Sequence, residues 1–140
     1  MTGLGIPDWY WHAVAGSTAL LLAILAAVTG AMLRGRLRRP RGMNVFAIHR
    51  GVAVAFVAVL IATFPLGHLA ADEFLFGLPQ ELHGWLGLAI IILGLGQLVP
   101  SLLVGTRKRM RLTHTIVGYL LAGLMAWQTG WGVLMILTGD

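Results

Sequence analysis

Four long apolar stretches limit this chain to one class of fold. They run approximately over residues 9–33, 45–68, 82–104 and 113–137. A hydrocarbon layer roughly 30 Å thick is crossed by about 20 helical residues, and each stretch is at least that long. The connections between the stretches are short, so consecutive helices must run antiparallel and pack as neighbours. We therefore predict an all-α, integral membrane four-helix bundle in which residues 1–140 form a single domain.

Composition excludes several other classes of protein. Only 11% of the residues are charged, whereas a soluble domain carries about a quarter. The net charge of +5 does not indicate a nucleic-acid partner, because the basic residues flank the apolar stretches and form no polar face. The chain has no cysteine, which excludes disulfides, iron–sulfur clusters and covalently attached haem.

Basic and acidic residues segregate to opposite ends of the predicted bundle. The basic ones lie in or beside the first and third connections, and the acids lie near the termini or in the second connection. The ten basic residues are Arg34, Arg36, Arg38, Arg39, Arg41, Arg50, Arg107, Lys108, Arg109 and Arg111, and the five acids are Asp8, Asp72, Glu73, Glu81 and Asp140. Basic connections stay in the cytoplasm, so we expect both termini on the extracytoplasmic face of the inner or plasma membrane.

Two other features fit that orientation. Aromatic residues that collect at membrane interfaces would lie at the outer one; they are Trp9, Tyr10, Trp11, Trp85, Trp127 and Trp131. No basic residue precedes the first apolar stretch and Asp8 stands before it, so we expect no cleaved signal peptide.

Each predicted helix carries one histidine near its start. They are His12, His49, His83 and His114, spaced 37, 34 and 31 residues apart. Because the helices alternate in direction, the first and third histidines share the outer level and the second and fourth share the inner level. A lone histidine in a span is usually a hydrogen-bonding residue, but four paired by level predict two metal centres with two histidine ligands each. At 1.5 Å per residue the two levels would be about 18 Å apart in depth.

A very small residue follows each histidine by four positions, one helical turn deeper. These residues are Gly16, Ala53, Gly87 and Gly118. They would leave room for a flat macrocycle beside the ligand, although small residues also serve as packing contacts between transmembrane helices. The fifth histidine, His68, has Asp72 at that position. We expect His68 to be interfacial, where it can hydrogen-bond an outer haem propionate.

Other polar residues join the candidate site by position. Gln97 and Gln128 each follow a histidine by fourteen residues, close to four whole turns, so each would reach the other level on its own helix. Each can bond a haem edge or a ligand imidazole, or simply link two helices. Four arginines border the inner pair and can hold anionic propionates, of which Arg50 and Arg111 are nearest to histidines; the others are Arg41 and Arg109.

The chain resembles the cytochrome b561 family over essentially its whole length. The third stretch opens Leu82-His83-Gly84-Trp85, similar to the family's Leu-His-Ser-Trp signature. The segments Ile48-His49-Arg50 and His114-Thr115-Ile116-Val117-Gly118 are similar to the starts of the family's second and fourth helices, and Gln97 with Pro100 is similar to the Gln-Pro of its bacterial branch. The resemblance implies a four-helix core with two non-covalent haems b, one bound by His12 and His83 and the other by His49 and His114.

Three functions remain open from the sequence. The first is transmembrane electron transfer between a donor on one face and an acceptor on the other, each of them a protein, a quinone or a small reductant. The second is the quinone-reactive cytochrome b subunit of a larger dehydrogenase or hydrogenase. The third is a haem-free structural or assembly subunit. With so little mass outside the bilayer, we expect a partner subunit or a second copy of the chain.

Overall fold

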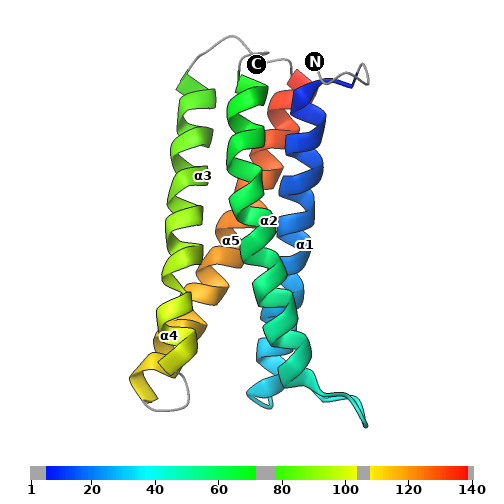
Figure 1. The fold of residues 1–140 in the computed structure, drawn as a ribbon, viewed down its shortest axis with the longest axis vertical. Helices are drawn as coiled ribbons and strands as arrows, with labels where there is room; N and C mark the ends of the chain where they lie inside the picture. Colours follow the sequence, from blue (N-terminus) through cyan, green and yellow to red (C-terminus); the bar gives the residue numbers. More distant parts are fainter. Residues whose placement is uncertain (1–5, 72–77, 104–107, 139–140) are drawn as a thin grey trace.

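The computed structural model describes residues 6–71, 78–103 and 108–138, which form a bundle of helices with no strand among them (Figure 1). The elements are α1 (Asp8–Leu33), α2 (Val45–Ala71), α3 (Leu78–Gly96), α4 (Leu98–Leu103) and α5 (Lys108–Thr138). These helices form four spans that are long and apolar enough to cross a membrane, and α3 and α4 together make the third. The protein is a multi-pass membrane protein, as the sequence predicts.

The helices extend into the segments that were predicted as connections. The second predicted stretch ends at residue 68, and the third and fourth begin at residues 82 and 113, but α2 continues to Ala71, α3 begins at Leu78 and α5 begins at Lys108. Residues 72–77 and 104–107 lie outside the described part of the chain. Arg107, Asp72, Glu73 and Asp140, which contributed to the predicted charge pattern, are therefore not placed.

The third apolar stretch is interrupted at Gln97, which separates α3 from α4. Pro100 lies three residues beyond this break, and proline has no N–H to donate to the Gly96 carbonyl. The Gln97 N–H is shared between the carbonyls of Leu93, at 3.0 Å, and Gly94, at 3.2 Å. The Ser101 N–H then donates to the Gln97 carbonyl at 3.1 Å, which restores the helical pattern. This break was not predicted.

The turn between α1 and α2 is closed by capping groups. Gly35 adopts φ +71°, and the N–H of Arg36 donates to the Ala31 carbonyl at 3.0 Å, which is the hydrogen-bond pattern of a Schellman cap. The Arg39 guanidinium donates to the Met32 carbonyl at 2.8 Å and also to the Leu33 carbonyl, which is a further helix-end acceptor. Asn44 begins α2 by accepting the Ala47 N–H at 3.1 Å.

The four spans form a square in cross-section. Helix α1 packs against α2 and α5, and α3 packs against the same two helices. Within the described residues α1 has no backbone contact with α3, and α2 has none with α5, so these two pairs are diagonal. Helices α1 and α2 form one antiparallel hairpin, and α3 and α5 form the other (Figure 1).

A compact apolar core fills the middle of the bundle. Its buried members come from all four spans, and Ile90 is only 1% exposed. They are Ala19, Ala23, Phe56, Leu60, Ile90, Leu121 and Met125. Many large apolar side chains elsewhere are exposed on the outer surface of the bundle, including Trp85 at 70%. Such a surface is stable in contact with lipid and not in water.

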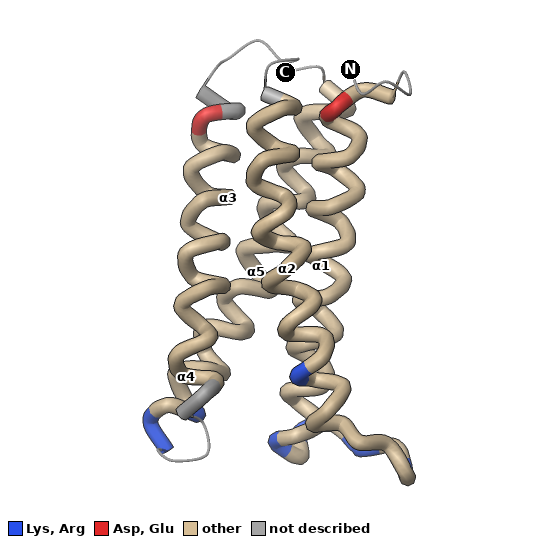
Figure 2. The backbone as a smooth tube through the Cα atoms, in the orientation of Figure 1, with Lys and Arg blue, Asp and Glu red and all other residues tan. Residues whose placement is uncertain are grey.

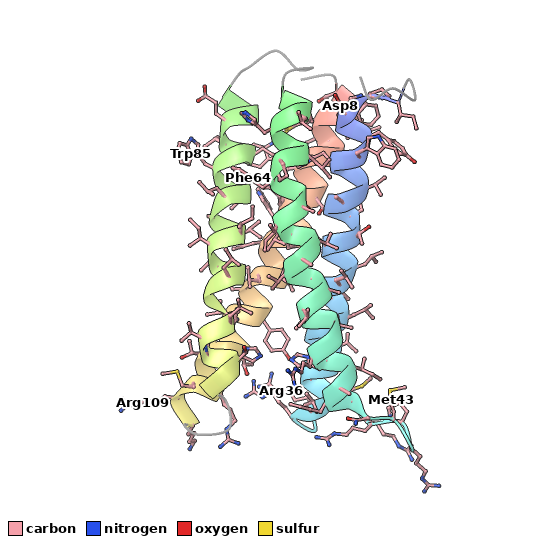
Figure 3. All side chains as sticks on the ribbon, in the orientation of Figure 1. Asp8, Arg36, Met43, Phe64, Trp85 and Arg109 are labelled. Carbon is pink, nitrogen blue, oxygen red and sulfur yellow. The ribbon has the colours of Figure 1, made fainter. Side chains whose placement is uncertain are left out.

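Charge separates along the bundle axis. Lys and Arg lie at one end of the described chain and Asp and Glu at the other (Figure 2). Figure 3 labels Asp8 and Trp85 towards one end and Arg36 and Arg109 at the opposite end. Helix α1 begins and α5 ends at the acidic end (Figure 1). We call this end the acidic end and the other the basic end.

Candidate functional site

Two pairs of imidazoles meet inside the bundle. His12 on α1 and His83 on α3 have ring centroids 6.1 Å apart, with the ring planes at 68°. His49 on α2 and His114 on α5 are also 6.1 Å apart, with the planes at 85°. Each pair joins two diagonal helices whose backbones do not touch. The rings therefore reach across the interior from opposite hairpins, in the two pairs that the sequence predicts from their levels.

Three of the four imidazoles are fixed through Nδ1 by the other helix of their own hairpin. His12 Nδ1 donates to the Thr63 carbonyl at 3.2 Å. His49 Nδ1 donates to the Ala26 carbonyl at 3.1 Å and lies 3.0 Å from the Thr29 hydroxyl oxygen. A carbonyl oxygen can only accept, so these rings carry their proton on Nδ1. Nε2 is then left with a free lone pair, which is the form of histidine that binds a metal.

Gln97 holds His114 at two points. Its Oε1 accepts the His114 Nδ1–H at 3.0 Å, and its Nε2 donates to the His114 carbonyl at 3.0 Å. We predicted that Gln97 could bond either a haem edge or a ligand imidazole, and in the structure its amide bonds the imidazole of His114. Gln128 makes the equivalent backbone contact, donating from Nε2 to the His83 carbonyl at 2.8 Å. No described residue is hydrogen-bonded to Gln128 Oε1 or to His83 Nδ1.

Three glycines lie directly against the imidazoles, and the sequence analysis missed them. A Cβ on Gly67 would be 2.8 Å from His12 Cε1, one on Gly132 would be 3.2 Å from His83 Cε1, and one on Gly30 would be 3.4 Å from His49 Cε1. Each glycine belongs to the other helix of the same hairpin. Without a side chain there, each ring can approach the neighbouring backbone closely, and the rings of His12 and His49 bond backbone carbonyls of that helix.

These contacts follow one repeated pattern in all four spans. Fourteen residues after each histidine stands the residue that contacts the other histidine of the hairpin, and eighteen residues after it stands a small residue. The contact residues are Ala26, Thr63, Gln97 and Gln128, and the small residues are Gly30, Gly67, Ser101 and Gly132. In a helix the carbonyl of residue i lies beside residue i+4, so a glycine there exposes the carbonyl to a neighbouring ring.

The sequence contained this signal only in part. The glutamines stand out as polar residues in an apolar span, and we predicted them at this spacing. Ala26 and Thr63 use backbone carbonyls, which every residue has, and glycine is common in these helices for packing. Only the comparison of all four spans at the same spacing separates these positions from the background. Thr29, a buried polar residue that contacts His49, was also missed.

The predicted small residues have mixed surroundings. Nothing lies within 4 Å of a Cβ placed on Gly16, so the space at this position is open. At Gly87 and Gly118 the nearest atoms are the Nε2 atoms of Gln128, at 3.4 Å, and of Gln97, at 3.8 Å. These two glycines therefore admit the amides of the neighbouring helix. Ala53 is half-buried on α2.

The remaining predicted site residues lie at the ends of the bundle. Arg50 and Arg111 are exposed, one beside His49 in the sequence and the other three residues before His114. His68 is exposed near the end of α2, and it is His12 that lies beside His83. Asp72, the residue that distinguished His68 from the other histidines, is outside the described chain.

The spacing of the imidazoles fits a metal held between them. A metal–imidazole nitrogen bond is about 2 Å long and the ring centre lies about 1 Å behind the nitrogen, so two imidazoles on opposite sides of one metal have centroids about 6 Å apart. No group of three or more His, Cys, Asp or Glu lies together in residues 6–71, 78–103 and 108–138. Two imidazoles alone do not complete a tetrahedral or octahedral shell. A metal held by either pair would need its other ligands from another source, such as an organic cofactor.

Comparisons of the chain with models of protein families, with curated proteins and with solved structures found no match.

Proposed function

We propose that this protein carries electrons across the membrane on two non-covalently bound haems b, as its resemblance to the cytochrome b561 family implies. The observation that carries the proposal is the meeting of two imidazole pairs, each at a centroid distance of 6.1 Å, between diagonal helices of an apolar bundle. A porphyrin would supply the other metal ligands, which the described residues beside the pairs do not provide. Its iron, when bound, accepts and releases one electron.

Four histidines are the proposed axial ligands. His12 and His83 hold the haem nearer the acidic end, which we call the outer haem, and His49 and His114 hold the inner haem. The Nδ1 hydrogen bonds of His12, His49 and His114 favour the proton arrangement that leaves Nε2 free for iron. Since each pair joins the two hairpins, haem binding would also fasten the hairpins together.

The separation of the two sites supports a two-step path. Gln97 touches His114 and stands fourteen residues after His83 on the same span, which is about 21 Å along a helix. One haem near each face would therefore cover most of a hydrocarbon layer roughly 30 Å thick. The apolar core between the pairs excludes water and ions from this path.

Charged groups would orient the protein and its haems. We infer that the basic end faces the cytoplasm and that both termini are extracytoplasmic, in the inner or plasma membrane. Arg50 and Arg111 are exposed near the inner pair and can pair with the inner haem's propionates. His68 can do so at the outer haem. The electron donor and acceptor would bind at the two ends, assisted by a partner subunit or a second copy of the chain.

A reduced-minus-oxidised absorption spectrum with haem quantitation on the purified protein tests the proposal. We expect two haems b per chain, both low-spin and both unreactive towards carbon monoxide when reduced, because two histidines leave no open coordination position. A ratio near one haem per chain, or ready carbon monoxide binding, would contradict the two-pair assignment. A purified, folded chain without haem would favour the structural or assembly subunit instead.

A further inference from the structure

Two complementary polar atoms beside the outer pair are buried and unpaired. Within the described chain neither His83 Nδ1 nor Gln128 Oε1 has a hydrogen-bond partner. The two residues are already in contact, because Gln128 Nε2 donates to the His83 carbonyl at 2.8 Å. Gly132, one turn beyond Gln128 on α5, leaves the space into which the His83 ring packs. Buried polar groups are nearly always satisfied in native proteins, so this pair needs an explanation.

At the inner pair, the equivalent histidine Nδ1 and glutamine Oε1 atoms are hydrogen-bonded to each other. Gln97 also donates from Nε2 to the carbonyl of its histidine, and its Oε1 accepts the Nδ1–H of the same residue. Gln97 and Gln128 stand at equivalent positions, fourteen residues after the histidine of their own span. The two glutamines differ in their backbone, since Gln97 lies between α3 and α4 and Gln128 lies within α5, and in whether the second hydrogen bond is closed. Gln128 and His83 already meet at the His83 carbonyl, so the second hydrogen bond would join two residues that are in contact.

We propose that Gln128 is a positioning residue for the outer haem, whose Oε1 accepts the Nδ1–H of His83 in the haem-loaded protein. This inference rests on the proposed function, since it concerns how a haem ligand is held. The bond fixes the proton of His83 on Nδ1, leaves Nε2 free for iron and sets the rotation of the ring. All four axial imidazoles are then held through Nδ1 from within their own hairpin.

The proposed bond has an electronic consequence. An acceptor on Nδ1–H makes the imidazole a stronger electron donor to the iron, which favours the oxidised state and lowers the reduction potential. If Gln128 served only to link α3 and α5 through the His83 carbonyl, it would affect stability and leave this electronic effect absent. The two roles belong to different atoms of one amide, so substitutions can separate them.

Two substitutions of Gln128 make the separation in the purified, haem-loaded full chain. Gln128→Met has a similar length but removes both the donor and the acceptor. Gln128→Glu keeps an acceptor oxygen for Nδ1–H and, when ionised, loses the donor to the His83 carbonyl. The readouts are the reduction potentials of both haems by redox titration and their low-spin electron paramagnetic resonance signals, which depend on imidazole orientation. Gln97→Met is the matched control and identifies the inner haem's component.

We expect Gln128→Met to raise the outer haem's potential and shift its resonance signal, with the inner haem unchanged. Gln128→Glu should return the potential to the wild-type value or below it. Equal shifts in both variants, or no shift in either, would overturn the inference while leaving two bound haems. If Gln128→Met does not fold, Gln128→Glu decides alone, because a potential above wild type contradicts the acceptor role. A wild-type chain without two haems would instead overturn the proposed function.

Discussion

The imidazole of His12 lies directly against the backbone of α2 at Gly67. A Cβ at Gly67 would be 2.8 Å from His12 Cε1 and 3.0 Å from Nδ1, closer than real contacts allow. We predict that Gly67→Ala displaces the ring, breaks its bond to the Thr63 carbonyl and leaves fewer than half of the chains with an outer haem. Haem per chain and the low-spin spectrum measure the effect.

Gly123→Ala is the matched control for this prediction, because nothing lies within 4 Å of its Cβ position. Alanine favours a helix over glycine by about 1 kcal/mol, so weaker helix formation cannot explain a haem loss confined to Gly67→Ala. Two haems retained in Gly67→Ala, with unchanged spectra, would show that the contact between His12 and Gly67 is not part of the haem site.

His12 and His68 are the two candidate ligands from the first hairpin for the proposed outer haem. His12 lies beside His83 and bonds α2, whereas His68 is exposed. We expect His12→Ala to abolish the outer haem or convert it to a high-spin form, and His68→Ala to keep both low-spin spectra. The measurement is a haem titration of each variant. Loss of a haem in His68→Ala alone would mean that the first ligand is wrongly assigned.

At the level of helices, sequence and structure agree where apolar length decides. The spans of α1 and α2 were predicted to within a few residues, because a membrane requires a minimum apolar length. The break at Gln97 was not predicted, because it depends on how the backbone hydrogen bonds rearrange before Pro100. The four paired histidines stand out as polar groups in apolar spans. The glycines and carbonyls that contact the histidine rings do not stand out in the sequence, because those groups occur throughout such helices.

Gln97 lies at the break between α3 and α4 and contacts His114. We predict that Pro100→Ala supplies the missing N–H, makes the third span continuous and turns the Gln97 amide away from the imidazole. The inner haem should then show a raised reduction potential or reduced occupancy, while the outer haem keeps its spectrum. Redox titration with haem quantitation follows both haems.

Pro65→Ala is a suitable control, because Pro65 lies inside α2 and that helix continues through it. This variant should leave the inner haem unchanged. An inner haem that is equally unaffected by Pro100→Ala would mean that the position of Gln97 does not depend on the break.

For the whole molecule, the separation of charge predicts the orientation in the membrane. The chain has no cysteine, so single introduced cysteines can report the side of each end. In spheroplasts, we expect Thr138→Cys to react with a membrane-impermeant maleimide and Leu37→Cys to react only after the membrane is opened. The opposite pattern would reverse the orientation and exchange the outer and inner haems.

The proposed transfer of electrons across a sealed membrane can be measured in reconstituted vesicles. Ferricyanide is trapped inside liposomes containing the haem-loaded protein, and an impermeant reductant is added outside. We expect the trapped ferricyanide to be reduced at a rate proportional to the bound haem. That rate should fall to the background of protein-free vesicles in His49→Ala, which lacks an inner ligand. If both haems of the wild type become reduced while the trapped ferricyanide stays oxidised, the protein does not carry electrons across the bilayer.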